Sequence, residues 1–174
     1  QAGLKTKFVD VDLKTFNIDL KNMKKKITNK TKVILAVHVL GNSTNMDKLK
    51  KIVKKNNLTL VEDTCESLVS KYDSKNLGTF GRFGSFSFFV SHQISAGEGG
   101  MIVCNDYNDY KIIHSLRSHG WDRGLNNKKK NDFNFINSGF NLRPMDITAA
   151  IGLNQFKRLN SMIKIRSLNR KKIT

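Results

Sequence analysis

Short apolar segments alternate with polar, lysine-rich segments along this chain, and their periodicity predicts alternating strands and helices. The apolar run Lys32–Val39 is continuous, which is typical of a parallel strand covered on both faces. The next segment, through Lys55, places apolar residues on one helical face: Met46, Leu49, Ile52 and Val53. Leu58–Val61 is the next predicted strand. A strand, a helix and a strand with short connections imply a right-handed crossover and a parallel sheet.

The same patterns predict further elements on both sides of this unit. Strands are expected at Lys7–Val11, Ser85–Val90 and Gly100–Asn105, and helices at Asp19–Ile27, Asp109–Arg117 and Met145–Leu159. The last helix offers apolar side chains to the core, namely Ile147, Ala150, Ile151 and Phe156, and another helix starts at Ser161. The predicted fold class is α/β, a mostly parallel sheet flanked by helices. We expect residues 1–160 to form one domain, with 161–174 beginning a helix that leaves it.

Composition narrows the possible functions. The chain has 174 residues and carries 31 Lys plus Arg against 14 Asp plus Glu, a formal net charge of +17. Such a charge favours nucleic-acid or phosphate binding, but lysines spread over many segments are more typical of solvated faces, so nucleic acid is a minor expectation. No apolar run approaches the roughly 18 residues of a membrane span, and no secretory signal is visible. A cytoplasmic protein without membrane association is therefore expected.

Candidate chemistry lies where two predicted strands end. Asp63 comes just after the strand Leu58–Val61 and can pair with a protonated ring nitrogen of a cofactor, although an ordinary strand-end acid is the alternative. Glu66 follows on the same segment, and Ser87 offers a strand-end hydroxyl suited to a phosphate. His92 stands before a GEGG turn and can shuttle a proton near neutral pH. The two cysteines form no CxxC, no metal-ligand motif occurs, and no G-x-S-x-G elbow supports a hydrolase.

Four segments in chain order carry a wider resemblance: VILAVHVLGNSTNMDKL, LTLVEDTCES, GTFGRFGSFSFFVSHQISAGEGGMIVCND and SGFNLRPMDITAAIGLNQF. In this order and spacing they resemble the DegT/DnrJ/StrS family of vitamin B6-dependent enzymes, which modify keto sugars attached to nucleotides. The resemblance runs through nearly all of the chain. It implies the large domain of a fold-type I PLP-dependent aminotransferase, with an N-terminal segment expected before Gln1 and a small C-terminal domain expected after Thr174.

The resemblance also assigns roles to single residues. Asp63 matches the aspartate that pairs with the pyridine nitrogen of the cofactor, and Ser87 matches the serine that binds its phosphate. Glu66 stands near the ring hydroxyl, where the family usually has Gln. Asn141 matches an asparagine that reaches the phosphate of the neighbouring subunit's cofactor, which implies a homodimer with shared active sites.

His92 departs from the main pattern of the family. Most members have a lysine there that binds pyridoxal 5'-phosphate covalently, and imidazole cannot form that linkage. The run HQISAGEGG resembles a dehydratase branch, which uses non-covalently held pyridoxamine 5'-phosphate to remove the 3-hydroxyl of a 4-keto-6-deoxy nucleotide sugar. This implies His92 as the base, Asp63 as the group that keeps the ring protonated, and glutamate as amino donor. Two separated cysteines disfavour the iron–sulfur version of these enzymes.

Three functions stay open at this point. The favoured one is a PLP/PMP-dependent 3-dehydratase of deoxysugar and lipopolysaccharide biosynthesis. A PLP-dependent sugar aminotransferase and a non-catalytic basic binding module are the alternatives. Trp121–Arg123 and Lys128–Lys130 are candidates for substrate contacts, and other residues that touch the substrate are expected outside this chain.

Overall fold

The computed structural model describes residues 3–125 and 133–173, within two compact units, Gln1–Ser87 and Phe88–Thr174. Lys128–Lys130, which the sequence suggests as substrate contacts, lie outside the described residues.

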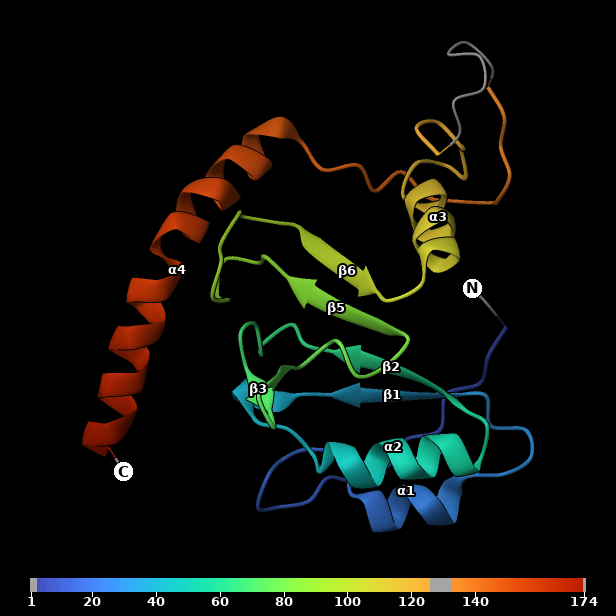
Figure 1. Cartoon of the computed structure of the whole chain (residues 1–174), viewed down its shortest axis with the longest axis vertical. Helices are drawn as coiled ribbons and strands as arrows, with labels where there is room; N and C mark the ends of the chain where they lie inside the picture. The colour runs from blue at the N-terminus through green and yellow to red at the C-terminus, as the bar shows by residue number, and fades with distance from the viewer. Residues whose placement is uncertain (1–2, 126–132, 174) are drawn as a thin grey trace. The chain divides into compact units, whose positions relative to one another are not determined.

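The first unit is built on parallel strands with helices on one face (Figure 1). β1 (Val33–Val37) pairs with β2 (Thr59–Asp63), and β2 pairs with β5 (Phe83–Ser87), all in parallel. α1 (Leu20–Lys26) and α2 (Met46–Lys55) contact each other, and α2 contacts β2. The predicted strand–helix–strand unit is confirmed, with its bounds moved by one or two residues.

Four features of this unit differ from the sequence expectation. A short 3-10 turn, η1 (Val39–Gly41), follows β1, and a small antiparallel hairpin joins β3 (Lys71–Tyr72) to β4 (Lys75–Asn76). The strand predicted at Lys7–Val11 is absent, because Val11 forms only an isolated bridge with Ile18. β5 begins earlier and ends earlier than the predicted strand Ser85–Val90.

Side chains at the helix ends explain where both helices begin and end. The Asp19 carboxylate accepts hydrogen bonds from the backbone N–H groups of Lys21 and Asn22, at 2.7 and 3.2 Å, and caps α1. The Asn45 side chain caps α2 in the same way by accepting from Lys48 N at 2.9 Å. Both helices carry lysines in their last turn, where the partial negative charge of the helix C-terminus favours cations.

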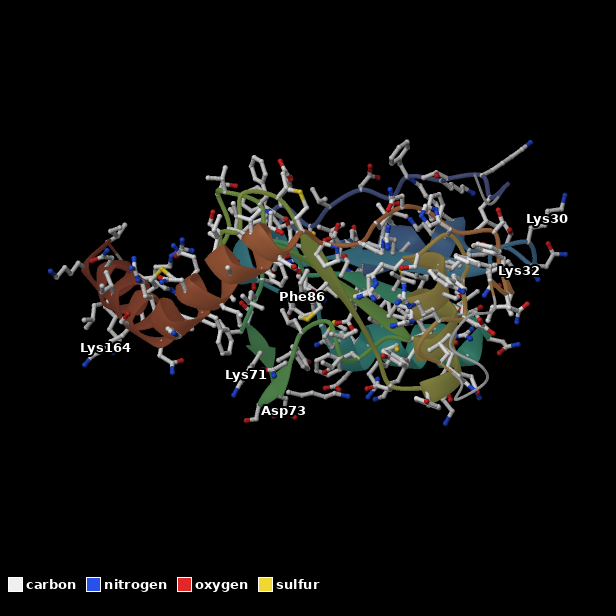
Figure 2. All side chains as sticks on the ribbon, turned by 90° about the horizontal axis from the view of Figure 1, so that it is seen from above. Lys30, Lys32, Lys71, Asp73, Phe86 and Lys164 are labelled. Carbon is white, nitrogen blue, oxygen red and sulfur yellow. The ribbon has the colours of Figure 1, made fainter. Side chains whose placement is uncertain are left out.

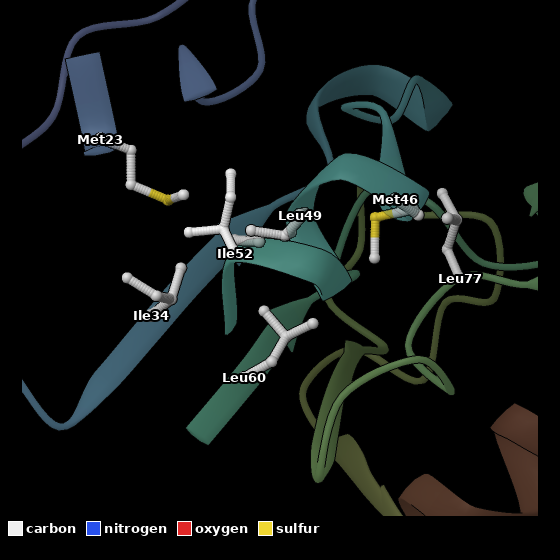
Figure 3. Packing of buried hydrophobic residues seen from close by; sticks show 8 residues of the cluster. Met23, Ile34, Met46, Leu49, Ile52, Leu60 and Leu77 are labelled. Carbon is white, nitrogen blue, oxygen red and sulfur yellow. The ribbon is translucent and has the colours of Figure 1, made fainter. Parts of the chain in front are cut away.

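One core lies between the two helices and the covered face of the sheet (Figure 3). Its buried members come from both helices, from β1 and β2, and from the segment before β5: Met23, Ile34, Ala36, Met46, Leu49, Ile52, Leu60 and Leu77. The alternation of buried and exposed positions along β1 and β2 follows from the period-two geometry of a strand.

Leu49 is fully buried in this core, at 0% exposure. Leu49→Ala should therefore lower the free energy of unfolding by about 2–5 kcal/mol, because it removes apolar contacts and leaves a cavity. Chemical denaturation of the full-length protein measures this. The exposed Leu13→Ala is the matched control and should change stability by less than about 0.5 kcal/mol; equal losses in the two variants would contradict the assignment of the core.

The second face of β1 is not covered within the described residues. Val33, Leu35 and Val37 are 40%, 57% and 44% exposed, whereas Ile34 and Ala36 are buried. The prediction that Lys32–Val39 is covered on both faces is therefore wrong for this structure. The continuous apolar run predicted a buried strand, but it does not distinguish a strand covered by helices on one face from a strand covered on both faces.

The second unit contains β6 (Gly100–Cys104), α3 (Tyr107–Leu116) and α4 (Asp146–Ile173). The predicted helix break before Ser161 is wrong, since α4 runs without interruption through this position. The apolar residues of α4 that were expected in the core are exposed: Ile147, Ala150, Ile151 and Phe156. The division into domains at residue 160 stays a prediction.

The lysines of the first unit that Figure 2 labels lie on the solvated surface. Lys30, Lys32 and Lys71 are exposed and point outward, whereas Phe86 lies inside. This agrees with lysines that cover solvated faces. Among the described helices, none is both long enough and apolar enough to cross a membrane.

Candidate functional site

Asp63 is the last residue of β2, and its carboxylate is held from one side. Its Oδ1 accepts a hydrogen bond from Cys65 N at 3.1 Å and one from the Ser85 hydroxyl at 3.4 Å. The Cys65 thiol forms a further hydrogen bond with this carboxylate, and the Asp63 side chain is half-buried. The carboxylate is thus oriented by its own loop and by the neighbouring strand, while part of its surface stays accessible.

Ser85 and Ser87 share the Asp63 face of the sheet. Ser85 lies opposite Asp63 in the parallel register, and Ser87 follows it at the end of β5. Because alternate residues of a strand point to the same face, both serines lie on the side opposite to the buried Gly84 and Phe86. The structure therefore brings the predicted Asp63 and Ser87 to neighbouring strand ends, on one face.

Glu66 lies in the loop after β2 and fixes the loop after β1. Its Oε2 accepts a hydrogen bond from Leu40 N at 3.0 Å, where Leu40 adopts a positive φ of 51° inside η1. Nearby, the Ser67 hydroxyl donates to His38 O at 2.6 Å and accepts from Gly41 N at 3.1 Å. Two loops at the carboxyl ends of β1 and β2, where α/β sheets bind ligands, are thereby tied together.

Glu62 is a site feature that the sequence did not reveal. It precedes Asp63, points to the opposite face of β2, and is fully buried. Oε1 contacts His38 Nε2 at 3.1 Å and accepts from Gly78 N at 2.7 Å, while Oε2 accepts from Phe80 N and Gly81 N at 2.7 and 2.6 Å. His38 is itself buried, and this contact gives it a structural role.

Burial alone would raise the pKa of the Glu62 carboxyl, but hydrogen bonds from His38, Gly81 and Gly78 lower this pKa below its ordinary value of 4.5. A group with a depressed folded pKa contributes stability above its unfolded pKa and loses it as pH falls through the folded value. We therefore expect the wild-type protein to lose unfolding free energy more steeply below pH 4.5 than Glu62→Gln does.

At pH 7 the same Glu62→Gln variant should be less stable than wild type by about 1–3 kcal/mol, because it leaves buried donors without an acceptor. Chemical denaturation of both proteins at several pH values between about 3 and 7 gives this comparison. Parallel acid slopes for the two proteins would rule out the contribution assigned to Glu62.

Cys65 lies beside Asp63 but is not poised as a nucleophile. Burial, a hydrogen bond to Asp63 and the negative charge of Asp63 raise the pKa of the Cys65 thiol to about 11. The thiol is therefore protonated at neutral pH, and the thiolate is the reactive form of cysteine.

His92 lies in the second unit, in a loop that closes on itself. β5 ends at Ser87, so His92 follows in a turn and not at a strand end, contrary to the expected strand through Val90. The His92 N–H donates to Phe89 O at 3.0 Å, and the imidazole meets the Phe89 ring edge-on at 6.0 Å between centroids. Among the described residues no hydrogen bond uses the imidazole nitrogens, so both are available to contact a ligand or to bind a proton.

The loop around His92 is shaped by backbone contacts and by glycine. Phe88 N donates to Gly99 O at 2.9 Å, and Ala96 N donates to Phe88 O at 2.9 Å, so residues 88 and 99 are held together. Gly97 and Gly99 have φ values of 84° and 140°, which other residues adopt only with strain. The GEGG turn is therefore a structural requirement of this loop, in addition to any contact with a ligand.

Asn141 lies in another loop of the second unit, beside the end of α3. It forms an isolated antiparallel bridge with Ser118. The hydrogen bonds on either side run from Phe140 N to Leu116 O at 2.7 Å and from Leu142 N to Arg117 O at 2.9 Å. Asn141 is exposed, and none of the hydrogen bonds within the described residues uses its side chain. Its amide is thus presented on a fixed backbone.

Trp121 and Arg123, suggested by the sequence as substrate contacts, belong to an aromatic group of the second unit. The Trp121 ring stacks on Phe133 at 4.9 Å between centroids, and the Arg123 guanidinium lies 5.0 Å from the Trp121 ring. A cation over an indole face is favourable, and here it is satisfied within the chain. No contact of these residues points to a substrate.

Sequence reasoning missed Ser85 and Glu62. Ser85 carried a usable signal, because the alternation SFSF places it on the same face as Ser87. Glu62 carried only a weak one, since a carboxylate inside an apolar strand must find donors. Which donors it finds depends on the path of the glycine-rich segment at residues 78–81, which the sequence indicated only as a turn. Within the described residues, no group of three or more metal-ligating side chains gathers.

A parallel α/β sheet with an oriented acid and two serines at its strand ends is typical of α/β proteins that bind a ligand at this edge of the sheet. Comparison with known proteins identifies the family. The model of the DegT/DnrJ/EryC1/StrS aminotransferase family matches residues 1–174. The chain belongs to this family.

Two curated relatives illustrate its range. The chain is 42% identical over 180 residues to GDP-4-keto-6-deoxy-D-mannose 3-dehydratase of Escherichia coli O55:H7, covering 97% of this chain and 46% of that protein. It is 38% identical over 156 residues to GDP-perosamine synthase of Escherichia coli O157:H7, covering 90% of this chain and 41% of that protein. The chain thus spans about half the length of the curated relatives it matches.

Solved structures agree with the sequence comparison. A mutant of GDP-4-keto-6-deoxymannose 3-dehydratase with bound GDP-perosamine superposes with a TM-score of 0.89 at 41% identity, covering 97% of this chain and 47% of that one. Other structures of the dehydratase hold hydrated PLP or a trapped PLP–glutamate geminal diamine. The predicted fold class is confirmed by these similarities.

Proposed function

We propose that this chain carries the larger part of the cofactor-binding domain of a nucleotide-sugar 3-dehydratase that uses pyridoxamine 5'-phosphate. The observation that carries the proposal is His92, a histidine with unengaged ring nitrogens where most of the family has lysine, in a chain 42% identical to a GDP-4-keto-6-deoxy-D-mannose 3-dehydratase. GDP-4-keto-6-deoxy-D-mannose is accordingly the first substrate to test.

The residues of the first unit fit a pyridine cofactor. Asp63 would hold the protonated ring nitrogen with its carboxylate, whose Oδ1 is oriented by Cys65 N and Ser85. Ser87 would bind the phosphate, and Glu66 would lie near the ring hydroxyl. When bound, the protonated ring of the cofactor supplies an electron sink for the substrate's keto carbon and its neighbours. A carboxylate beside the ring nitrogen favours the protonated ring.

His92 would move the proton in this reaction. A neutral imidazole nitrogen accepts a proton as base and can return it as acid near neutral pH. A lysine in its place would bind the cofactor covalently. His92 therefore keeps the cofactor free, while its Phe89 contact and backbone hydrogen bond restrict the imidazole.

Three further parts of the proposal rest on the family resemblance. Glutamate would be the amino donor, which is supported by the PLP–glutamate structure of the relative. Asn141 would reach the phosphate in the partner subunit of a homodimer, which is supported by its exposed amide on a fixed backbone. The location would be cytoplasmic.

The test is a reaction of the full-length protein with GDP-4-keto-6-deoxy-D-mannose, pyridoxal 5'-phosphate and glutamate, followed by mass spectrometry and NMR of the sugar. The expected product lacks the 3-hydroxyl. A product that keeps the hydroxyl and gains an amine would instead select a sugar aminotransferase, the class that the family's description favours.

A third outcome would favour a non-catalytic module. If the protein binds neither B6 form and binds nucleic acid in a salt-dependent way, the net charge of +17 would be its functional feature. Heparin and a single-stranded oligonucleotide serve as probes for this outcome.

A further inference from the structure

The Glu62 carboxylate has no part in the chemistry proposed above, yet it is among the most completely bonded groups of the first unit. It is 0% exposed and takes three backbone N–H donors and His38 on its two oxygens. An apolar side chain of similar volume would often stabilise a core as well as a buried charge does. Stability alone therefore does not explain why a carboxylate is buried here, and the geometry of its hydrogen bonds has to be considered.

The donors come from the turn that leads into β5. Gly78, Phe80 and Gly81 all direct their N–H groups at Glu62. This close approach needs glycine, because a Cβ on Gly81 would lie 2.5 Å from Leu60 O and a Cβ on Gly84 would collide with Gly78 O. The glycine-rich turn is thus wrapped around the carboxylate of the neighbouring strand.

The turn decides the register of β5. Arg82 N, the next amide along, donates to Leu60 O at 2.8 Å, and the ladder continues with Asp63 opposite Ser85. A slip of β5 by one residue would place Gly84 or Phe86 opposite Asp63 and turn both serines to the other face. A glycine-containing strand is prone to such slippage unless something fixes it.

We propose that Glu62 is a positioning residue that fixes the register of β5 on β2, so that Ser85 holds the Asp63 carboxylate and Ser87 faces the same side. It acts through the backbone of residues 78–81 and touches neither cofactor nor substrate. The consequence for cofactor binding rests on the proposed function, whereas the consequence for register does not.

The register is tested first, without any cofactor. Hydrogen exchange, read by mass spectrometry on the full-length protein, compares wild type with Glu62→Gln. Peptides that cover residues 78–82 and the amide of Thr64, which donates to Ser85 O at 2.9 Å, should exchange about tenfold faster in the variant. Leu49→Ala, which weakens the core but removes none of the hydrogen bonds of Glu62, is the control and should not speed exchange in these peptides selectively.

The link to Asp63 is tested by a double-mutant cycle. Affinity for pyridoxamine 5'-phosphate is measured by absorbance titration in wild type, Glu62→Gln, Asp63→Asn and the double variant. Glu62→Gln should weaken binding about tenfold in the wild-type background and clearly less in the Asp63→Asn background, because the part of its effect that passes through Asp63 is then already lost. Leu49→Ala should bind normally at a temperature well below its melting point.

The variant Glu62→Asp distinguishes the effect of side-chain length at residue 62 from the effect of its negative charge. It keeps the carboxylate but shortens the side chain, so it should fail to restore both exchange protection and affinity. Full restoration by Glu62→Asp would overturn the proposal in favour of a charge effect, and so would an unchanged Thr64 peptide in Glu62→Gln. If wild type binds no B6 form, the proposed function fails, and the exchange experiment still decides on the register.

Discussion

His92→Lys should convert a protein that binds pyridoxamine 5'-phosphate reversibly into one that captures pyridoxal 5'-phosphate covalently. A lysine amine at this position can bind the aldehyde, as it does in most of the family, and imidazole cannot. The variant should develop a pyridoxal absorbance that borohydride fixes to the protein. Dehydration should fall by about 10²–10⁴-fold, the usual contribution of a general base.

Wild type is itself the control for capture, because it carries the same surface lysines and so measures the background of reducible adducts that form away from residue 92. His119→Asn is the matched control for loss of a histidine: His119 is exposed and has a φ of 62°, which asparagine tolerates. Its turnover should stay near that of wild type. A His92→Lys variant that neither binds pyridoxal covalently nor loses activity would remove residue 92 from the site.

Asp63→Asn should be the second most damaging change. The amide cannot stabilise a protonated pyridine ring, and losing one partner of a partly buried charged pair costs about 3–5 kcal/mol. At about 1.4 kcal/mol per tenfold, turnover should fall by roughly 140- to 4,000-fold. The cofactor spectrum should shift toward that of the unprotonated ring, which stopped-flow absorbance and a pH titration both measure.

Asp73→Asn provides the comparison for this variant. Asp73 is exposed in the β3–β4 turn and has a φ of 47°, so asparagine fits its backbone (Figure 2). It should leave activity and spectrum unchanged. If Asp63→Asn behaves like Asp73→Asn, the carboxylate at the end of β2 has only a structural role.

The strands and helices of the first unit were predictable because their apolar periodicity is strong. Leu49 and Ile52 alternate with lysines at helical spacing, and both are buried in the structure. The β3–β4 hairpin was not predictable, because its turn uses Asp73 and Ser74 at positive φ where Asn-Gly would have been the clear signal. Lys7–Val11 alternates well but finds only one bridge partner. Alternation predicts a strand only where another strand is available to pair with it.

The candidate site was predictable in part. Asp63 and Ser87 were suggested by their places at strand ends, and the structure puts them on one face, while their roles stay predictions. Ser85 and Glu62 became visible only once the register between two strands was known, which depends on the fold of the intervening turn. His92 was found as a residue type that departs from a family pattern, but the length of its strand was overestimated because Phe88 and Val90 continue the alternation beyond the last paired residue.

The uncovered face of β1 bears on how this protein can be handled in the laboratory. Val33, Leu35 and Val37 form an apolar stripe along a strand at the margin of its sheet. Such a stripe invites association with other copies when nothing shields it. Recombinant production of residues 3–87 alone is therefore expected to give aggregates at high concentration. Threonine at positions 33 and 37, which keeps the β-branching of valine while adding a hydroxyl, is the substitution to try for a tractable sample.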